Sequence, residues 1–180
     1  FLIQRLPAGW SKPAWFLILF SFLPLSILSA SRMLPILSPL TPLFRQADAL
    51  GIQWIEQNLP EQAHILVNPA PWGYGLYIGS DGGYWIAPLT GRKTTPAALL
   101  YSFGKHSLVR QEVARIQEIV QALDDPENLA SILRAQGIDY VYIGARGGAL
   151  SAQKLLQSSS FHLLYQQDGV RIFKVGLPPP

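Results

Sequence analysis

The chain of 180 residues is long enough for one ordinary domain and one additional segment. Its apolar content of 49% is high for a water-soluble protein, which indicates that part of the chain is shielded from water. Residues 1–45 hold four of the 14 basic side chains and none of the 11 acidic ones, so the remainder is nearly neutral. A nucleic-acid-binding domain carries its excess of basic residues on a folded face, and the charge distribution therefore argues against one.

An uncharged segment of 19 residues runs from Pro13 to Ser31. As a helix it would measure about 28 Å, close to the thickness of the hydrocarbon core of a membrane. Aromatic and basic side chains flank it, as they do at membrane interfaces: Arg5, Trp10, Lys12, Trp15 and Arg32. We therefore expect residues 1–32 to be one transmembrane helix with its flanks, in contact with membrane lipid. Basic residues occur on both sides, so the positive-inside rule does not settle the orientation.

Pro24 lies inside this segment, and lipid-embedded helices tolerate proline when neighbouring helices satisfy the freed carbonyl. We therefore expect further transmembrane helices upstream of Phe1, a residue that is itself not a methionine. A cleaved signal peptide is the alternative, with Ser29-Ala30-Ser31 as the cleavage site and a soluble enzyme as the product. Its apolar region is usually shorter than this one.

Residues 33–46 contain Pro35, Pro39 and Pro42, spaced so that no regular helix passes through them. We expect an extended connector there. The pattern of a globular domain then extends over residues 47–176, and residues 177–180 are expected to be a disordered tail.

The domain begins with helical spacing. Ala47, Leu50, Gly51, Trp54 and Ile55 predict an amphipathic helix that ends near Pro60. A buried strand is expected at residues 63–67. Residues 68–95 are rich in turn residues, and only Tyr84 to Leu89 is typical of a strand.

In the second half, periodicity and capping signals predict a helix over residues 109–123 and another from Asp125-Pro126 to Gly137. A strand at 138–143 and a helix at 149–158 follow. The end is a hairpin of residues 161–167 and 170–175, joined by Asp168-Gly169. Alternating helices and strands closed by an antiparallel pair predict a small three-layer α/β sheet, preceded by the transmembrane helix.

The common catalytic signatures are missing from the sequence. There is no cysteine, the three histidines lack the spacing of metal ligands, and neither G-x-S-x-G nor H-E-x-x-H occurs. Residues 144–148 follow a strand and precede a helix, as a phosphate-binding loop does, but they lack its glycine pattern. We expect a flexible connection there, and no catalytic residue, metal site or cofactor in this chain.

One turn-rich segment combines aromatic and charged side chains in an arrangement that suits a ligand. The candidate ligand-binding residues are Trp72, Tyr74, Asp81, Tyr84, Trp85, Arg92 and Lys93. Aromatic rings stack on sugars or lipid headgroups, a carboxylate accepts hydrogen bonds from hydroxyls, and a basic pair holds phosphate, so a glycosyl phosphate is a fitting ligand. The alternative is that the aromatic side chains form the core of a large ordered loop.

Several stretches resemble a known family. After the apolar span come A-D-A-L-G-I-Q-W-I-E-Q-N-L-P, A-H-I-L-V, S-D-G-G-Y-W-I-A-P-L-T-G-R-K-T and G-I-D-Y-V-Y-I-G. Together they resemble the C-terminal extracytoplasmic region of bacterial polytopic glycosyltransferases of the GT-C superfamily, from Pro13 to Val175. D-G-G-Y-W with L-T-G-R is the more particular motif, and the helix motif is the commoner one.

The resemblance implies a cell-membrane protein whose α/β domain is extracytoplasmic and whose sugar donor is a polyprenyl phosphate sugar. Such enzymes place the catalytic acid on the first extracytoplasmic loop, far upstream of this sequence, so no catalytic residue is carried over. The implied partners are a lipid-linked sugar or glycan acceptor and upstream transmembrane helices of the same protein. A non-enzymatic, membrane-anchored binding or assembly module is the alternative, with the aromatic loop as a protein contact.

Overall fold

The computed structural model describes residues 11–33 and 41–176, including the side chains of residues 16, 17 and 20–33 in the first range. The chain divides into two compact units, residues 1–41 and residues 42–180. Half of the expected connector, residues 34–40, and all of the expected tail at 177–180 lie outside the described residues.

The described part of the first unit forms the helix α1, which comprises Ser11–Met33 and has Pro24 inside it. A helix is thus present where the uncharged segment predicts one. Its large apolar side chains with described positions are exposed, among them Phe16, Phe20 and Ile27. Among the described residues, no helix combines the length and the apolar character needed to cross a lipid bilayer.

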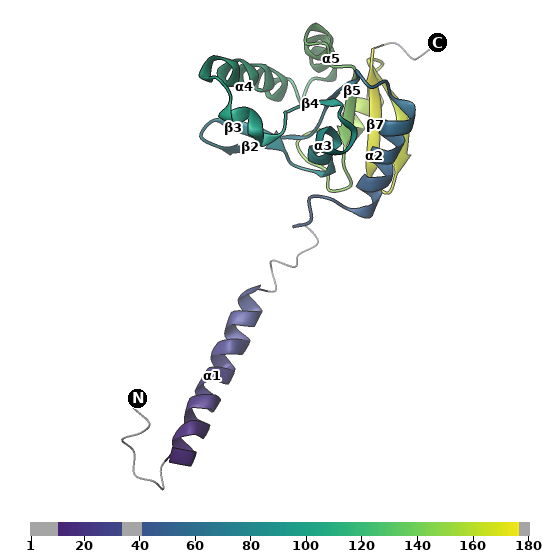
Figure 1. Ribbon diagram of the computed structural model, residues 1–180. Helices are drawn as coiled ribbons and strands as arrows, with labels where there is room; N and C mark the ends of the chain where they lie inside the picture. Colours follow the sequence, from purple (N-terminus) through teal and green to yellow (C-terminus); the bar gives the residue numbers. More distant parts are fainter. Residues whose placement is uncertain (1–10, 34–40, 177–180) are drawn as a thin grey trace. The chain divides into compact units, whose positions relative to one another are not determined.

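The second unit is built on a mixed sheet of five strands in the order β4-β1-β5-β7-β6 (Figure 1). The strands are β1 His64–Leu66, β4 Lys93–Thr95, β5 Tyr140–Ile143, β6 Phe161–Gln167 and β7 Val170–Val175. Strand β1 pairs in parallel with β4 and β5, and β7 pairs antiparallel with β5 and β6. The predicted C-terminal hairpin is confirmed, with Asp168 and Gly169 at positive φ in its turn.

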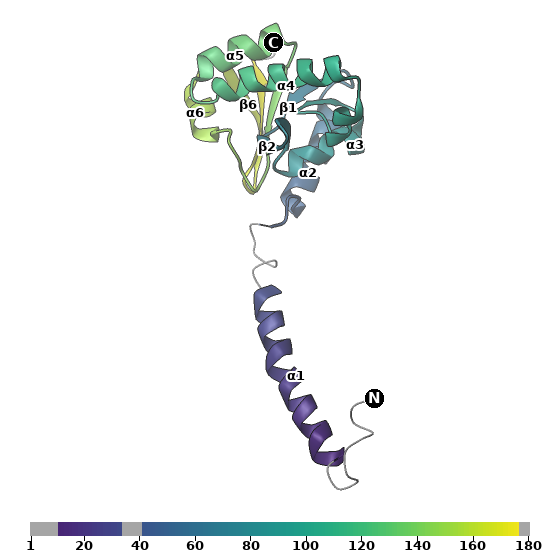
Figure 2. The ribbon, with the colours of Figure 1, turned by 90° about the vertical axis from the view of Figure 1, so that its left-hand side faces the viewer.

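Helices cover both faces of this sheet, so the predicted three-layer α/β arrangement is confirmed. Figure 2 shows α2 and α3 on one side of the strands and α5 and α6 on the other. The helices are α2 Gln46–Asn58, α3 Ile86–Thr90, α4 His106–Gln121, α5 Pro126–Ala135 and α6 Ala152–Gln157. Each of the two faces has its own apolar core.

The alternation of strand side chains explains the two cores. Along β1, Ile65 packs with α2 and α3, whereas Leu66 packs with α4, α5 and α6. In β5, Tyr142 lies on the α2 side of the sheet, whereas its sequence neighbours Val141 and Ile143 lie on the other side. Both faces of the central strands are therefore buried, as the continuous apolar runs of β1 and β5 indicate.

The turn-rich segment after β1 contains more regular structure than predicted. It forms a separate two-stranded hairpin, β2 Pro69–Gly73 and β3 Leu76–Gly79, and then the 3₁₀ helix η3 Gly82–Trp85. The predicted strand from Tyr84 to Leu89 is wrong, since these residues are helical in η3 and α3. Asp81 caps η3 by accepting a hydrogen bond from the Gly83 amide, and this cap overrides the alternating pattern that is typical of a strand. A further 3₁₀ helix, η4 Leu99–Phe103, precedes α4.

Candidate functional site

The seven candidate residues occupy different places in the domain. They comprise four exposed or half-buried aromatic residues, two buried charged residues and one exposed lysine: Trp72, Tyr74, Tyr84, Trp85, then Asp81 and Arg92, then Lys93. Even the sequence neighbours Arg92 and Lys93 line different pockets. The combined site for a glycosyl phosphate that the sequence suggested is therefore not assembled from all seven residues.

Arg92 closes the C-terminal end of α2. Its Nη2 donates to the carbonyl oxygens of Glu56 at 3.0 Å and Leu59 at 2.7 Å, and its Nε donates to that of Pro60 at 3.1 Å. The last carbonyls of a helix lack partners within the helix, and a cation there is also attracted by the negative end of the helix dipole. With 4% of its surface exposed, Arg92 fastens α2 to the start of β4 and is not presented to a phosphate.

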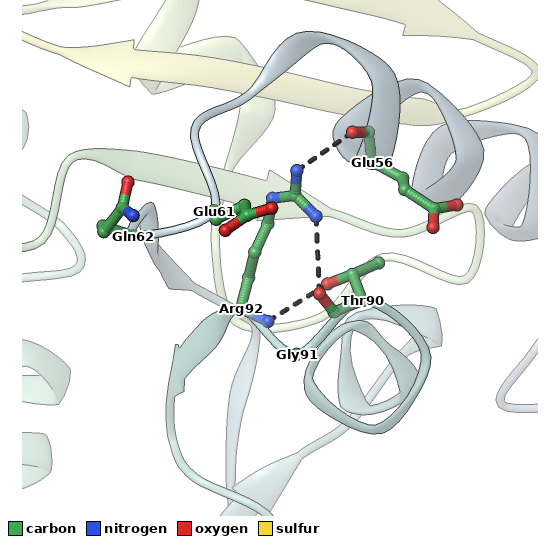
Figure 3. Close-up of a pocket in the computed structure, with 6 residues that line it drawn as sticks. All are labelled: Glu56, Glu61, Gln62, Thr90, Gly91 and Arg92. Atoms are coloured by element: carbon green, nitrogen blue, oxygen red, sulfur yellow. Dashed lines mark hydrogen bonds between the residues drawn. The ribbon is translucent and has the colours of Figure 1, made fainter.

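A pocket of about 480 Å³ lies beside this contact (Figure 3). Its lining residues are Glu56, Glu61, Gln62, Thr90, Gly91 and Arg92. Figure 3 shows dashed contacts from the Arg92 guanidinium to the backbone of Glu56 and Thr90, and both glutamates are exposed. An anionic ligand is disfavoured here because the cation is already committed and the two other charges are negative.

Asp81 is fully buried and joins three segments of chain. One carboxylate oxygen accepts from the Gly83 amide at 2.9 Å, and the other accepts from the Gly144 amide at 2.7 Å and from the Asn68 side chain. Asn68 in turn accepts from the Leu150 amide at 2.8 Å. Asp81 and Asn68 thus tie η3 and the end of β1 to the loop that follows β5.

A second buried carboxylate, Asp48 in the first turn of α2, lies next to this group. Its Oδ1 accepts from the Tyr142 hydroxyl at 2.8 Å and from the Ala145 amide at 2.9 Å, and its Oδ2 accepts from the Arg45 amide at 2.8 Å. Gly82 is required beside it, since a Cβ at that position would lie 2.3 Å from Asp48 Cγ. Burial, followed by the charge of Asp48, raises the pKa of Tyr142, which keeps its hydroxyl a donor.

This buried polar group fills the place where open α/β sheets usually bind ligands. The connection from β1 to β4 passes through α3 on one face of the sheet, and the connection from β4 to β5 passes through α4 and α5 on the other face. In such a sheet the ligand-binding crevice lies where the two connections diverge, at the carboxyl ends of β1 and β5. Asn68 and Asp81 occupy that crevice with their own side chains. The loop of residues 144–148 packs directly on them, because a Cβ on Gly148 would lie 2.6 Å from Asn68 Cγ.

Asp48 and Asn68 were not singled out from the sequence. A signal exists for each: an acidic residue in the first turn of an amphipathic helix, and an asparagine directly after a buried strand. Both positions have commoner explanations in capping and turn formation, so the sequence alone does not reveal that they meet.

Burial shifts the pKa of Asp81 and that of His64 in opposite directions. Desolvation raises the pKa of Asp81 to about 6, against the lowering effect of its hydrogen-bond donors. Desolvation, helped by Lys93, lowers the pKa of His64 to about 4. His64 lies in β1, where its ring nitrogens bond the Gly137 carbonyl at 3.0 Å and the Thr95 hydroxyl at 2.8 Å, so it is a structural residue.

Trp85 is the candidate that combines a fixed position with an accessible ring. It packs edge-to-face on Phe44, with ring centroids 6.3 Å apart, and on Tyr84, with centroids 5.8 Å apart. The side chain is still 42% exposed. An indole held in this way offers a surface for the apolar face of a sugar ring without first having to be ordered.

In residues 11–33 and 41–176, no three or more histidine, cysteine, aspartate or glutamate side chains lie together so that they could hold a metal ion. Comparison of the sequence with protein-family models and with curated proteins finds no match.

We predict that replacing Arg92 with lysine lowers the free energy of unfolding by about 2 kcal/mol, because an ammonium cannot bond three diverging carbonyls and leaves buried acceptors unsatisfied. Arg110→Lys, an exchange on the exposed surface of α4, is the matched control and should change stability by less than about 0.5 kcal/mol. Urea titration of both variants measures the difference. Equal midpoints would contradict the structural role of Arg92.

We predict opposing pH dependences from Asp81 and His64. Between pH 4 and 6 the folded state holds a proton on Asp81 that the unfolded state has lost, so this group makes stability fall as pH rises. His64 is neutral in the folded state above about pH 4, whereas the unfolded state still binds a proton, so it makes stability rise with pH.

The two contributions should nearly cancel in the native protein and become visible in variants. Relative to the native chain, Asp81→Asn should give an unfolding free energy that rises more steeply between pH 4 and 6, and His64→Gln should give the reverse. The slope against pH, measured by urea titration at several pH values, is the readout, because the absolute stability of either variant also changes. Parallel slopes in all three proteins would rule out these pKa shifts.

Proposed function

We propose that this chain is the membrane-attached C-terminal part of a glycosyltransferase that takes its sugar from a lipid-linked donor. In this proposal the α/β domain lies outside the cytoplasm and helps to bind the glycan acceptor or covers the active site. The catalytic carboxylate lies upstream of Phe1, as the resemblance to polytopic glycosyltransferases implies.

The main support for a binding role rather than a chemical one is the burial of the charged candidates. Asp81 and Arg92 are 0% and 4% exposed, and their hydrogen bonds go to groups of the domain itself. Neither side chain is placed to donate a proton to a bound sugar or to remove one from it. What the segment presents to a ligand is aromatic surface.

Trp85 is the group that we assign to glycan contact. It is half exposed, held by Phe44 and Tyr84, and lies in the same 3₁₀ helix as the glycines that pack against Asp48 and Asp81. Sugar rings stack on such indoles, and such a ring is present both in a lipid-linked sugar and in a glycan acceptor.

Membrane attachment is assigned to the segment from Pro13 to Ser31. The support for this assignment is the uncharged run of 19 residues in the sequence, which lies within α1. Within α1, the hydroxyls of Ser21 and Ser26 donate to the carbonyls four residues earlier, each at 2.8 Å. Polar groups satisfied inside the helix are what a hydrocarbon environment requires.

An assembly module without enzymatic activity is the second candidate, favoured by the exposure of Trp72 and Tyr74, which suits a protein contact as well. The upstream sequence discriminates the two functions. Eight or more further spans with an acidic residue in the first outer loop indicate the enzyme, and a single anchor indicates the module.

We predict that the chain of residues 1–180 remains with membranes after a wash with sodium carbonate at high pH. Leu23→Lys combined with Ile27→Lys should release it, because two lysines near the middle of the helix cost about 6 kcal/mol. Leu89→Lys combined with Leu163→Lys adds the same charge at exposed positions of the domain and should leave the chain in the pellet. A native chain found in the aqueous fraction would refute the anchor.

We predict that Trp85→Ala in the full-length enzyme raises KM for the glycan acceptor about tenfold and leaves kcat within about twofold, since uniform binding is lost. Trp85→Phe should retain most of the affinity because a ring remains. Leu89→Ala, an exposed apolar neighbour in α3, is the control and should behave as the native enzyme. Native kinetics in Trp85→Ala would remove this residue from the binding site.

A further inference from the structure

Five apolar side chains of the described domain stand out by their exposure. We name them the docking surface: Trp72, Tyr74, Leu100, Phe103 and Leu108. Tyr74 is completely exposed, and Phe103 and Leu100 are 86% and 75% exposed. A soluble domain rarely leaves so many large apolar groups in water close together, and such surfaces mark contacts with a partner or a membrane.

The chain is built so that these side chains are presented together. Tyr101 of η4 donates its hydroxyl proton to the Tyr77 carbonyl and accepts from the Tyr77 amide, both at 3.1 Å, which fixes η4 against β3. Figure 1 shows the β2–β3 hairpin and the start of α4 at the same side of the domain, away from β6 and β7. At the tip of the hairpin Gly73, Tyr74 and Gly75 all have positive φ, so the turn projects the tyrosine outward.

Charge indicates which partner fits. In residues 69–111 the acidic side chains amount to Asp81 alone, which is buried, whereas Lys93, Lys105 and Arg110 are exposed. The next acid along α4, Glu112, pairs with Arg115 at 3.4 Å. The exposed charges of residues 69–111 are therefore all basic, whereas the partly exposed Glu112, which lines a pocket with Leu108, is paired with Arg115.

Exposed aromatic and aliphatic side chains in a stretch whose exposed charges are all basic suit one occupant in particular. Indole and phenol rings prefer the headgroup level of a bilayer, and each lysine or arginine near an anionic leaflet adds on the order of fivefold in affinity. We propose that the docking surface binds the interfacial region of an anionic lipid bilayer and forms a membrane contact separate from α1. This inference rests on the proposed function for the presence of a bilayer beside the domain.

The absence of cysteine allows a direct test with a single label. Leu100→Cys places an environment-sensitive NBD fluorophore on the docking surface, and Gln121→Cys places it at the opposite end of α4, at an exposed position. The labelled full chain is reconstituted with phosphatidylcholine vesicles containing 30% phosphatidylglycerol, recovered by flotation, and quenched with nitroxide-bearing lipid. We expect emission from position 100 to shift to the blue and to be quenched at least threefold more than that from position 121.

Two further variants test the two kinds of contact separately. Combined Trp72→Ser, Tyr74→Ser and Phe103→Ser should abolish the extra quenching through loss of apolar contact. Combined Lys105→Glu and Arg110→Glu should reduce it severalfold, as should vesicles without phosphatidylglycerol. All these side chains are exposed, so circular dichroism should show the native fold.

The outcomes separate this inference from the proposed function. Equal quenching at positions 100 and 121 in a chain that floats with vesicles overturns the docking surface and leaves the anchor standing. Extra quenching that persists in the variant with Leu23→Lys and Ile27→Lys supports the docking surface independently of α1. A chain that does not float with anionic vesicles at all overturns both, and so leaves a protein as the partner of this surface.

Discussion

Two carboxylates buried side by side, those of Asp48 and Asp81, hold the α/β domain together at the carboxyl ends of its parallel strands. Between them they accept hydrogen bonds from Arg45 just before α2, from η3, from β5, from Asn68 after β1 and from the loop after β5. Charges of the same sign at such a depth persist only when every oxygen is satisfied. The glycines around them, such as Gly82, leave the space that this close packing needs.

This packing determines where function can reside. A doubly wound sheet normally offers the crevice at its topological switch point to a ligand, and here the protein's own Asn68 and Asp81 occupy it. In our proposals the ligand contacts lie instead on elements next to the sheet. Trp85 belongs to η3, which Asp81 caps, and the docking surface is formed by the hairpin that follows Asn68 together with η4 and the start of α4. The buried group thus fixes elements that carry the binding surfaces we propose.

Much of the fold could be predicted from the sequence because local and tertiary preferences agree there. Helix α5 begins at Asp125-Pro126, and the turn of the last hairpin is Asp168-Gly169, both set by residues that act locally. The segment after β1 was mispredicted in part, because the Asp81 cap that starts η3 depends on distant Gly144 and Asn68. The partners of Asp81 and Arg92 are also distant in sequence. From the sequence both residues therefore resemble ligand-binding residues, and only the structure shows that they bond groups of the domain itself. The exposed aromatics were found because composition alone marks them.

The position of β7 in the sheet has a consequence for how the domain comes into being. Strand β7 is the last of the five to be synthesised, yet it lies between β5 and β6 and pairs with both. The chain is synthesised from its N-terminus. The apolar core on the α2 side of the sheet therefore lacks Val170 and Ile172 until β7 has emerged. The nascent domain therefore remains an open, incomplete sheet until residues 170–175 have emerged, and unpaired strand edges and apolar surface stay exposed until then.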